Sequence, residues 1–115
     1  MMHWYHDLYM DDRVAKNPER CKKRVMRRRP WKRSYYAITL AANEANLFEI
    51  IGTRQLFFRR YAYLDLYIIG LATDYQGAVA LLQKIIADIC GKDKEFRPRE
   101  YFDKDDFENS EPEGK

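Results

Sequence analysis

One apolar stripe between residues 75 and 90 constrains the fold of this chain more than any other feature. Six apolar residues recur there at intervals of three and four, as one face of an α-helix requires: Ala78, Leu81, Leu82, Ile85, Ile86 and Ile89. Thr73 or Asp74 can cap the start of this helix, and Gly91 suits a left-handed cap at its end. The spacing predicts a long helix that buries Leu82 and Ile86, at the middle of the stripe, against a sheet.

Short apolar segments before this helix predict the sheet. Residues 64–72 and 35–42 are rich in β-branched and aromatic side chains, as strands covered on both faces are. Between them, residues 46–58 are expected to form a second helix, although Gly52 and Thr53 weaken it. Its apolar stripe would consist of Leu47, Ile50, Ile51 and Phe58. A further strand is expected over residues 95–102, at a sheet edge because Pro98 lacks an amide hydrogen.

These elements predict an α/β domain over residues 34–102, in the order strand, helix, strand, helix, strand. Strands joined by helical crossovers are usually parallel, so a small sheet of three to four mostly parallel strands is expected. A ferredoxin-like α+β sandwich with an antiparallel sheet is the alternative fold.

Two flanking regions complete the expected organisation. Residues 1–33 form an aromatic and basic N-terminal extension, in which residues 3–10 are either a strand or a docking arm. Asn17 and Pro18 resemble the start of a helix that Pro30 ends. Residues 103–115 carry six acids and two lysines and are expected to form a disordered tail.

Three segments of the chain resemble a known family. They are Trp4-Tyr5-His6-Asp7-Leu8-Tyr9, Tyr36-Ala37-Ile38-Thr39-Leu40-Ala41 and Leu66-Tyr67-Ile68-Ile69-Gly70-Leu71-Ala72. Together they are similar to a family of small uncharacterised proteins of anaerobic Firmicutes, over residues 4–102. The resemblance implies a bacterial cytoplasmic protein and transfers no activity. No apolar run approaches the roughly 20 residues of a membrane helix, so no membrane partner is expected.

The basic residues are concentrated in one segment. Residues 13–33 hold eleven Lys or Arg against a single acid, Glu19. Clustered cations beside an aromatic ring can bind phosphates and stack a base, and a solvated helix face is the simpler interpretation. The candidate nucleic-acid contacts are Lys22, Lys23, Arg24, Arg27, Arg28, Arg29, Trp31, Lys32 and Arg33.

The ends of the two predicted central strands form a second candidate site, for a small anion. Loops that lead into helix N-termini present free amide hydrogens, here around Asn43, Asn46, Thr73 and Asp74. No glycine-rich phosphate motif is present, and the negative charge of Asp74 would repel a phosphate. Simple helix capping is the favoured interpretation of these residues.

Aromatic residues supply a third candidate, a protein interface. The chain has nine tyrosines and two tryptophans, side chains that bury a large area while keeping a polar end. A small domain can also use them simply to cover its sheet. The candidate interface residues are Trp4, Tyr5, Tyr9, Tyr61 and Tyr63.

No candidate for catalysis, a metal or a cofactor is predicted. His3, His6 and Asp7 would leave a zinc site incomplete. Cys90 is expected to pack as a small apolar residue, and Cys21, beside two cations, has no evident base. The sequence therefore predicts a non-enzymatic binding or accessory module that acts through protein contacts, including self-association. The alternatives are association with nucleic acid through residues 20–33 and binding of a small anion at the strand ends.

Overall fold

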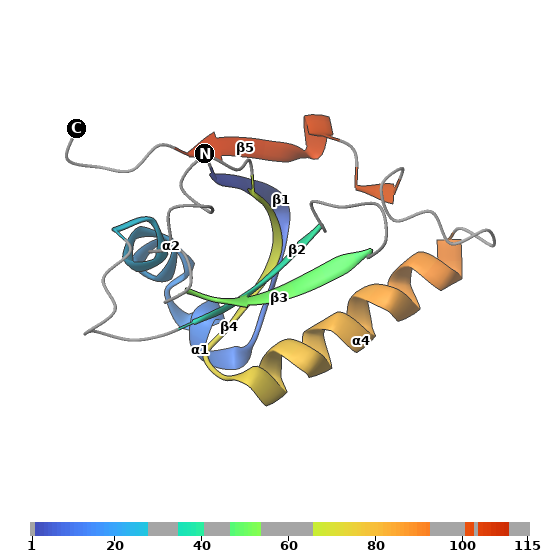
Figure 1. The fold of residues 1–115 in the computed structure, drawn as a ribbon, viewed down its shortest axis with the longest axis horizontal. Helices are drawn as coiled ribbons and strands as arrows, with labels where there is room; N and C mark the ends of the chain where they lie inside the picture. Colours follow the sequence, from blue (N-terminus) through green and yellow to red (C-terminus); the bar gives the residue numbers. More distant parts are fainter. Residues whose placement is uncertain are drawn as a thin grey trace.

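The fold is built on one mixed five-stranded sheet (Figure 1). The structure, a computed structural model, describes residues 2–27, 35–40, 47–53, 66–92, 101–102 and 104–110. The strand order is β3-β2-β4-β1-β5, and among these strands β1 and β4 are parallel while all other neighbours are antiparallel. The strands are β1 (Met2–Met10), β2 (Tyr36–Leu40), β3 (Phe48–Gly52), β4 (Leu66–Ala72) and β5 (Phe107–Ser110).

Helices cover both faces of the sheet and produce three layers. On one face lie α1 (Asp12–Lys16) and α2 (Pro18–Arg27), which bury Val14, Cys21 and Val25 against the sheet. The long helix α4 (Tyr75–Lys92) lies across the other face, and the short 3-10 helix η2 (Lys104–Asp106) precedes β5. Because β4 is buried on both faces, its sequence is almost continuously apolar. Within the described ranges, no helix is long and apolar enough to span a membrane.

Side-chain caps fix where the helices begin. The Asp74 carboxylate accepts from the Gly77 amide at 2.6 Å at the start of α4, which confirms one of the two predicted caps. The Asn17 side chain accepts from the Arg20 amide at 3.3 Å at the start of α2, as expected. The predicted end at Gly91 is wrong, because α4 continues to Lys92.

The predicted second helix is wrong over its first half. Residues 48–52 form β3, which pairs with β2 as an antiparallel hairpin. Phe48 and Ile50 pack on the α4 side of the sheet and Ile51 on the other, so these residues alternate as in a strand. The spacing of Leu47, Ile50 and Ile51 fits both the helix period of about 3.6 residues and the strand period of two. The aromatic Phe48 and the β-branched Ile50 and Ile51 favour a strand. Phe58 lies outside the described residues.

The expected sheet is therefore corrected in two respects. It has five strands instead of three to four, and it is mostly antiparallel instead of mostly parallel. The mixed content of helices and strands is as predicted. The mostly antiparallel sheet fits the α+β class, the alternative, better than the mostly parallel α/β sheet. In α+β folds helices gather on one face of an antiparallel sheet, whereas here they cover both faces.

The flanking regions belong to the sheet. Residues 3–10, left open between strand and docking arm, form part of strand β1, which lies in the sheet between β4 and β5. The tail predicted to be disordered from residue 103 is ordered over 104–110, where β5 pairs with β1 and buries Phe107. Of the strand expected at 95–102, only Tyr101 and Phe102 are described. Tyr101 is helical and Phe102 lies in a bend, so this part of the prediction is wrong.

The buried face of α4 is narrower than the apolar stripe predicted from the sequence. Ala78, Ile85 and Ile89 are fully buried, and Leu81 nearly so. Leu82 is only half-buried and Ile86 is 36% exposed, so the expectation that both are buried is wrong. The apolar stripe of α4 is wider than the part of the helix that packs on the sheet. The side of α4 nearest β3 therefore stays open to solvent.

Candidate functional site: a cleft between β1 and α4

An irregularity in β1 creates the candidate site. Trp4 pairs with Ile68 and Tyr9 pairs with Gly70. Between these two pairs β1 advances by five residues and β4 by two, so β1 contains extra residues, as in a β-bulge. A Cβ atom added to Gly70 would lie 3.2 Å from Ile38 Cδ1 and 3.4 Å from the Tyr9 carbonyl oxygen. The tight contact would be with the Ile38 side chain on β2, whereas Tyr9 would be in ordinary van der Waals contact, so glycine here makes room chiefly for Ile38.

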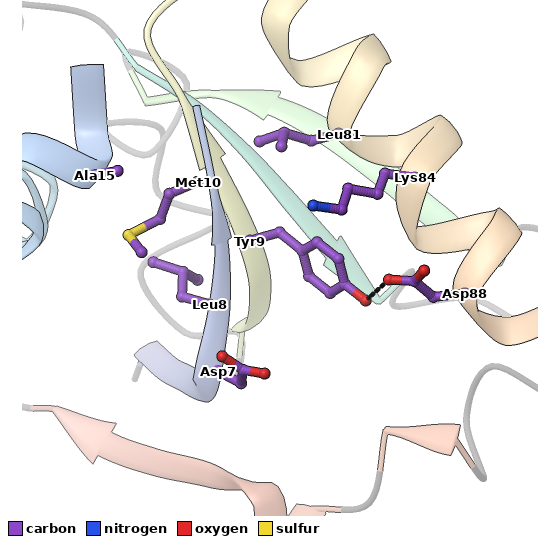
Figure 2. A pocket seen from close by; sticks show the side chains of 8 residues that line it. All are labelled: Asp7, Leu8, Tyr9, Met10, Ala15, Leu81, Lys84 and Asp88. Atoms are coloured by element: carbon purple, nitrogen blue, oxygen red, sulfur yellow. Dashed lines mark hydrogen bonds between the residues drawn. The ribbon is translucent and has the colours of Figure 1, made fainter. Parts of the chain in front are cut away.

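The Tyr9 side chain is anchored to α4 by one hydrogen bond. Its hydroxyl donates to Asp88 Oδ2 at 2.5 Å (Figure 2). Burial, and then this bond to a carboxylate, raise the pKa of Tyr9 above its usual 10.0. The phenol therefore stays protonated at neutral pH and acts as a donor.

Two adjoining shallow hollows flank this pair, and Asp7, Tyr9 and Asp88 line both. The first, of about 330 Å³, is completed by Leu8, Met10, Ala15, Leu81 and Lys84. The second, of about 510 Å³, is completed by Tyr5, Ala87, Gly91, Lys92 and Tyr101. In Figure 2, Leu8 and Met10 lie on the far side of β1 from Tyr9, so the polar groups face the α4 side. We refer to both hollows together as the β1–α4 cleft.

Aromatic rings form the wall of the second hollow. The Tyr5 ring meets Phe102 edge-on at 5.0 Å between centroids, and Tyr101 meets Phe102 at 4.8 Å. The Lys92 ammonium lies 5.9 Å from the centroid of Tyr101. Burial, and then the nearby Tyr101, Asp106 and Asp7, raise the pKa of Tyr5, so its phenol also stays neutral. The wall thus presents the neutral phenol of Tyr5 and the ring of Tyr101, over which an ammonium group already lies.

The charges around the cleft are mixed and mostly at its rim. Asp7, Lys84 and Lys92 are exposed, whereas Asp88 is half-buried. Such a site can hold a cationic group between a carboxylate and an aromatic face.

Two of the predicted interface residues, Tyr5 and Tyr9, line this cleft. The prediction of Trp4 as an interface residue is wrong, because Trp4 is only 1% exposed and packs in the core. The Lys22 ammonium lies 5.7 Å from the centroid of its ring. Tyr61 and Tyr63 lie outside the described residues.

The histidines and cysteines lie elsewhere. His3 and His6 are three apart in a strand, which directs them to opposite faces. His3 stacks on Tyr67 at 4.5 Å, and His6 Nδ1 lies 2.9 Å from the Asp106 carbonyl oxygen. In the described part of the chain, no three His, Cys, Asp or Glu side chains are grouped as metal ligands. Cys90, predicted to be packed, is exposed, and Cys21 is buried.

The described part of the basic segment lies on α2, across the sheet from the cleft. Arg24 donates to the Tyr35 hydroxyl at 3.1 Å, and the Lys22 ammonium lies 3.6 Å from the Glu19 carboxylate as well as over Trp4. These two cations therefore have contacts within the fold. Lys23 is exposed on the outer face. Arg27 ends α2. The other candidates, Arg28, Arg29, Trp31, Lys32 and Arg33, lie outside the described residues.

The predicted anion loop is occupied by the chain itself. The Thr73 amide and hydroxyl both donate to Asp11 Oδ2, and Asp74 caps α4. Burial alone would raise the pKa of Asp11, but hydrogen bonds from Val14, Thr73 and Arg13 hold it below its usual value. A negative charge therefore already occupies the position that an anion would take. Asn43 and Asn46 lie outside the described residues.

Sequence reasoning missed five polar or aromatic residues of the cleft: Asp7, Lys84, Asp88, Lys92 and Tyr101. Asp88 lies in the expected helix but carries no local signal, because its partner Tyr9 is 79 residues away. Comparisons with protein-family models, curated proteins and solved structures return no match. The cleft itself must therefore support any functional proposal, and the Firmicutes resemblance stays a prediction.

Proposed function

We propose that this protein is a non-enzymatic binding module that takes a basic side chain of a partner protein in the β1–α4 cleft. The observation that carries the proposal is the Tyr9–Asp88 hydrogen bond, which lies between two hollows that both include Asp7. This bond holds the half-buried Asp88 carboxylate next to the rings of Tyr5 and Tyr101. A lysine or arginine side chain can pair with the carboxylate and pack against the rings at the same time.

Lys92 shows that the Tyr101 ring can face a cation. A partner's cation would take this place by displacing the exposed Lys92 ammonium, which lies 5.9 Å from the ring centroid. Cation–π contacts contribute about 0.5–2 kcal/mol, depending on how far they are desolvated. A hydrogen bond to the Asp88 carboxylate would add about 1.5–3 kcal/mol. One captured side chain thus accounts for modest affinity, which suits a reversible protein contact.

The protonation of Tyr9 supports binding over catalysis. A phenol with a raised pKa remains a neutral donor at pH 7, and it is a poor nucleophile and a poor base. Its hydroxyl instead holds the Asp88 carboxylate in place for a second donor. The proposal therefore assigns positioning to Tyr9 and charge recognition to Asp88 and Asp7.

Peptide titration tests the proposal. Fluorescently labelled hexalysine is titrated with the protein at low salt, with labelled hexaglutamate as the charge-reversed probe. Hexalysine is expected to bind, and Asp88→Asn combined with Tyr9→Phe is expected to weaken it about tenfold, the equivalent of about 1.4 kcal/mol. Asp88→Asn alone should account for most of the loss.

Glu19→Gln is the matched control, since it removes one negative charge from α2 on the other face of the sheet. It should leave hexalysine binding within a factor of about two, since exposed charges contribute little. Equal weakening by the control and the cleft variants would mean that net charge, and not the cleft, attracts the peptide.

Nucleic acid is a second candidate, favoured by the outer face of the α1–α2 layer. Arg13, Lys16, Arg20 and Lys23 are all exposed there. We expect any such binding to weaken steeply with salt, because each neutralised phosphate releases counterions. Charge reversal of Arg20 and Lys23 should then reduce binding to single-stranded RNA and duplex DNA alike. No binding of either probe at low salt would remove this candidate.

A further inference from the structure

Two exposed apolar residues lie on the flank of α4 away from the β1–α4 cleft. Among the described residues, the large apolar side chains exposed to solvent are Leu47, Tyr75 and Ile86, at 42%, 56% and 36%. Tyr75 and Ile86 lie on α4, and Leu47 directly precedes β3. Exposed apolar residues gathered on one side of a small protein mark a binding surface more often than chance exposure does.

The sheet beneath this side is only partly covered. α4 packs over β4, β2 and β1, whereas β3 lies beyond it at the end of the strand order. Figure 1 shows β3 and α4 as separate elements along this side. Phe48 and Ile50, on the face of β3 that looks toward the α4 layer, are consequently only half-buried.

The open flank of α4 has the spacing of a helix–helix seam. Tyr75, Val79, Leu82 and Ile86 follow one another at intervals of four, three and four residues. This is the alternation of the a and d positions in a heptad, which places all four on one narrow stripe. Val79 and Leu82 are half-buried at its centre, and Tyr75 and Ile86 are exposed at its ends. We call this stripe the α4 seam.

The charge pattern favours a second α4 as the occupant. α4 carries no charged residue from Tyr75 to Gln83. The solvent-facing residues next to the seam are Gln76, Gln83 and the exposed Cys90, so two seams can meet without like-charge repulsion and without burying a charge. The charged residues Lys84, Asp88 and Lys92 belong to the cleft on the other flank.

The seam is also self-complementary. In an antiparallel pair related by a two-fold axis near Ala80, Tyr75 of each copy lies opposite Ile86 of the other, and Val79 lies opposite Leu82. Such isologous contacts close on themselves and give dimers, not filaments.

We propose that two copies of this chain associate through the α4 seam, with the exposed Leu47 edge of each copy flanking the paired helices. The inference is independent of the proposed function, since the β1–α4 cleft lies on the opposite flank and stays open in the dimer.

Sedimentation velocity and equilibrium over a concentration series test this surface. The wild type should approach twice the 13.9 kDa mass of the chain as concentration rises. Ile86→Glu and Tyr75→Glu should each raise the dissociation constant at least tenfold. Both positions are exposed, so the monomer should tolerate the charge, and far-UV circular dichroism with thermal melting verifies that the variants fold.

Lys84→Gln is the matched control. It changes the net charge by the same single unit on the same helix, but on the cleft flank, and it should leave the dissociation constant unchanged. A wild type that stays monomeric up to millimolar concentration would overturn the proposal. So would a dimer that both seam variants leave intact.

Discussion

Asp11 and Thr73 join the carboxyl ends of the two parallel strands. The amide and the hydroxyl of Thr73 both donate to Asp11 Oδ2 at 2.7 Å, while Asp11 Oδ1 accepts from the Val14 amide at 2.8 Å. One carboxylate therefore caps α1 and also ties the end of β1 to the turn that starts α4. It couples the two elements that form the β1–α4 cleft.

Removing this carboxylate should destabilise the fold. Asp11→Ala is expected to cost about 2–3 kcal/mol, since it removes a helix cap and leaves the donors of Thr73 unpaired. Asp12→Ala is the control, because Asp12 is exposed in the first turn of α1, and it should cost less than about 1 kcal/mol. Urea denaturation measures both, and equal costs would refute the role of Asp11 as a tie.

The same pair predicts a pH dependence. The pKa of Asp11 is lowered in the fold, so its contribution to stability is complete above its ordinary value of 3.8 and disappears as the pH falls below it. The free energy of unfolding of the wild type should therefore converge on that of Asp11→Asn as the pH drops from about 5 toward 2. Urea midpoints that stay separated by a constant amount would contradict this assignment.

Gly70 should limit packing at the centre of the sheet. Gly70→Ala brings a methyl group within 3.2 Å of the fully buried Ile38 side chain, and overpacking of this kind costs about 1–3 kcal/mol. The Tyr9 backbone would stay in ordinary contact, so hexalysine binding should change little. Gly91→Ala is the control: its Cβ meets no atom within 4 Å, and in a helix alanine should stabilise by about 0.5–1 kcal/mol. Thermal melting of both variants tests the contrast.

The sequence predicts elements well where local periodicity is strong. The stripe from Ala78 to Ile89 gives α4, and the apolar run before it gives β4. Which part of a wide stripe is buried depends on where the sheet lies, so Ile85 is buried whereas Ile86 is exposed. The Leu47–Ile51 segment fits both helix and strand spacing, and only its pairing with β2 decides for the strand.

The site was less predictable than the elements. Tyr5 and Tyr9, predicted as interface residues because tyrosine suits interfaces, line the cleft, but the residues they meet there come from distant segments. The Tyr9–Asp88 bond depends on the extra residues of β1, which no local pattern encodes. The strand β5 was missed because Phe107 is a lone aromatic residue within an acidic stretch.

Tyr9 should also make stability fall at alkaline pH. Its pKa is raised in the fold, so its contribution is complete below the ordinary value of 10.0 and is lost as the pH rises above it. The wild type should therefore lose stability faster than Tyr9→Phe between about pH 9.5 and 11.5. The check is a series of urea midpoints for the two proteins, and parallel curves would show that the Tyr9–Asp88 bond is absent in solution.

Phe107 should stabilise the fold even though it lies in an acidic stretch. It is 9% exposed, meets Tyr67 edge-on at 5.2 Å between ring centroids and contacts Tyr5 at 5.6 Å. Phe107→Ala should cost about 3 kcal/mol, at the low end for emptying a buried aromatic position because β5 lies at the edge of the sheet. Glu108→Ala changes the exposed neighbour on the same strand and should stay within about 0.5 kcal/mol of the wild type. A disordered tail would make both substitutions neutral, so equal urea midpoints for the two variants would remove β5 from the folded core.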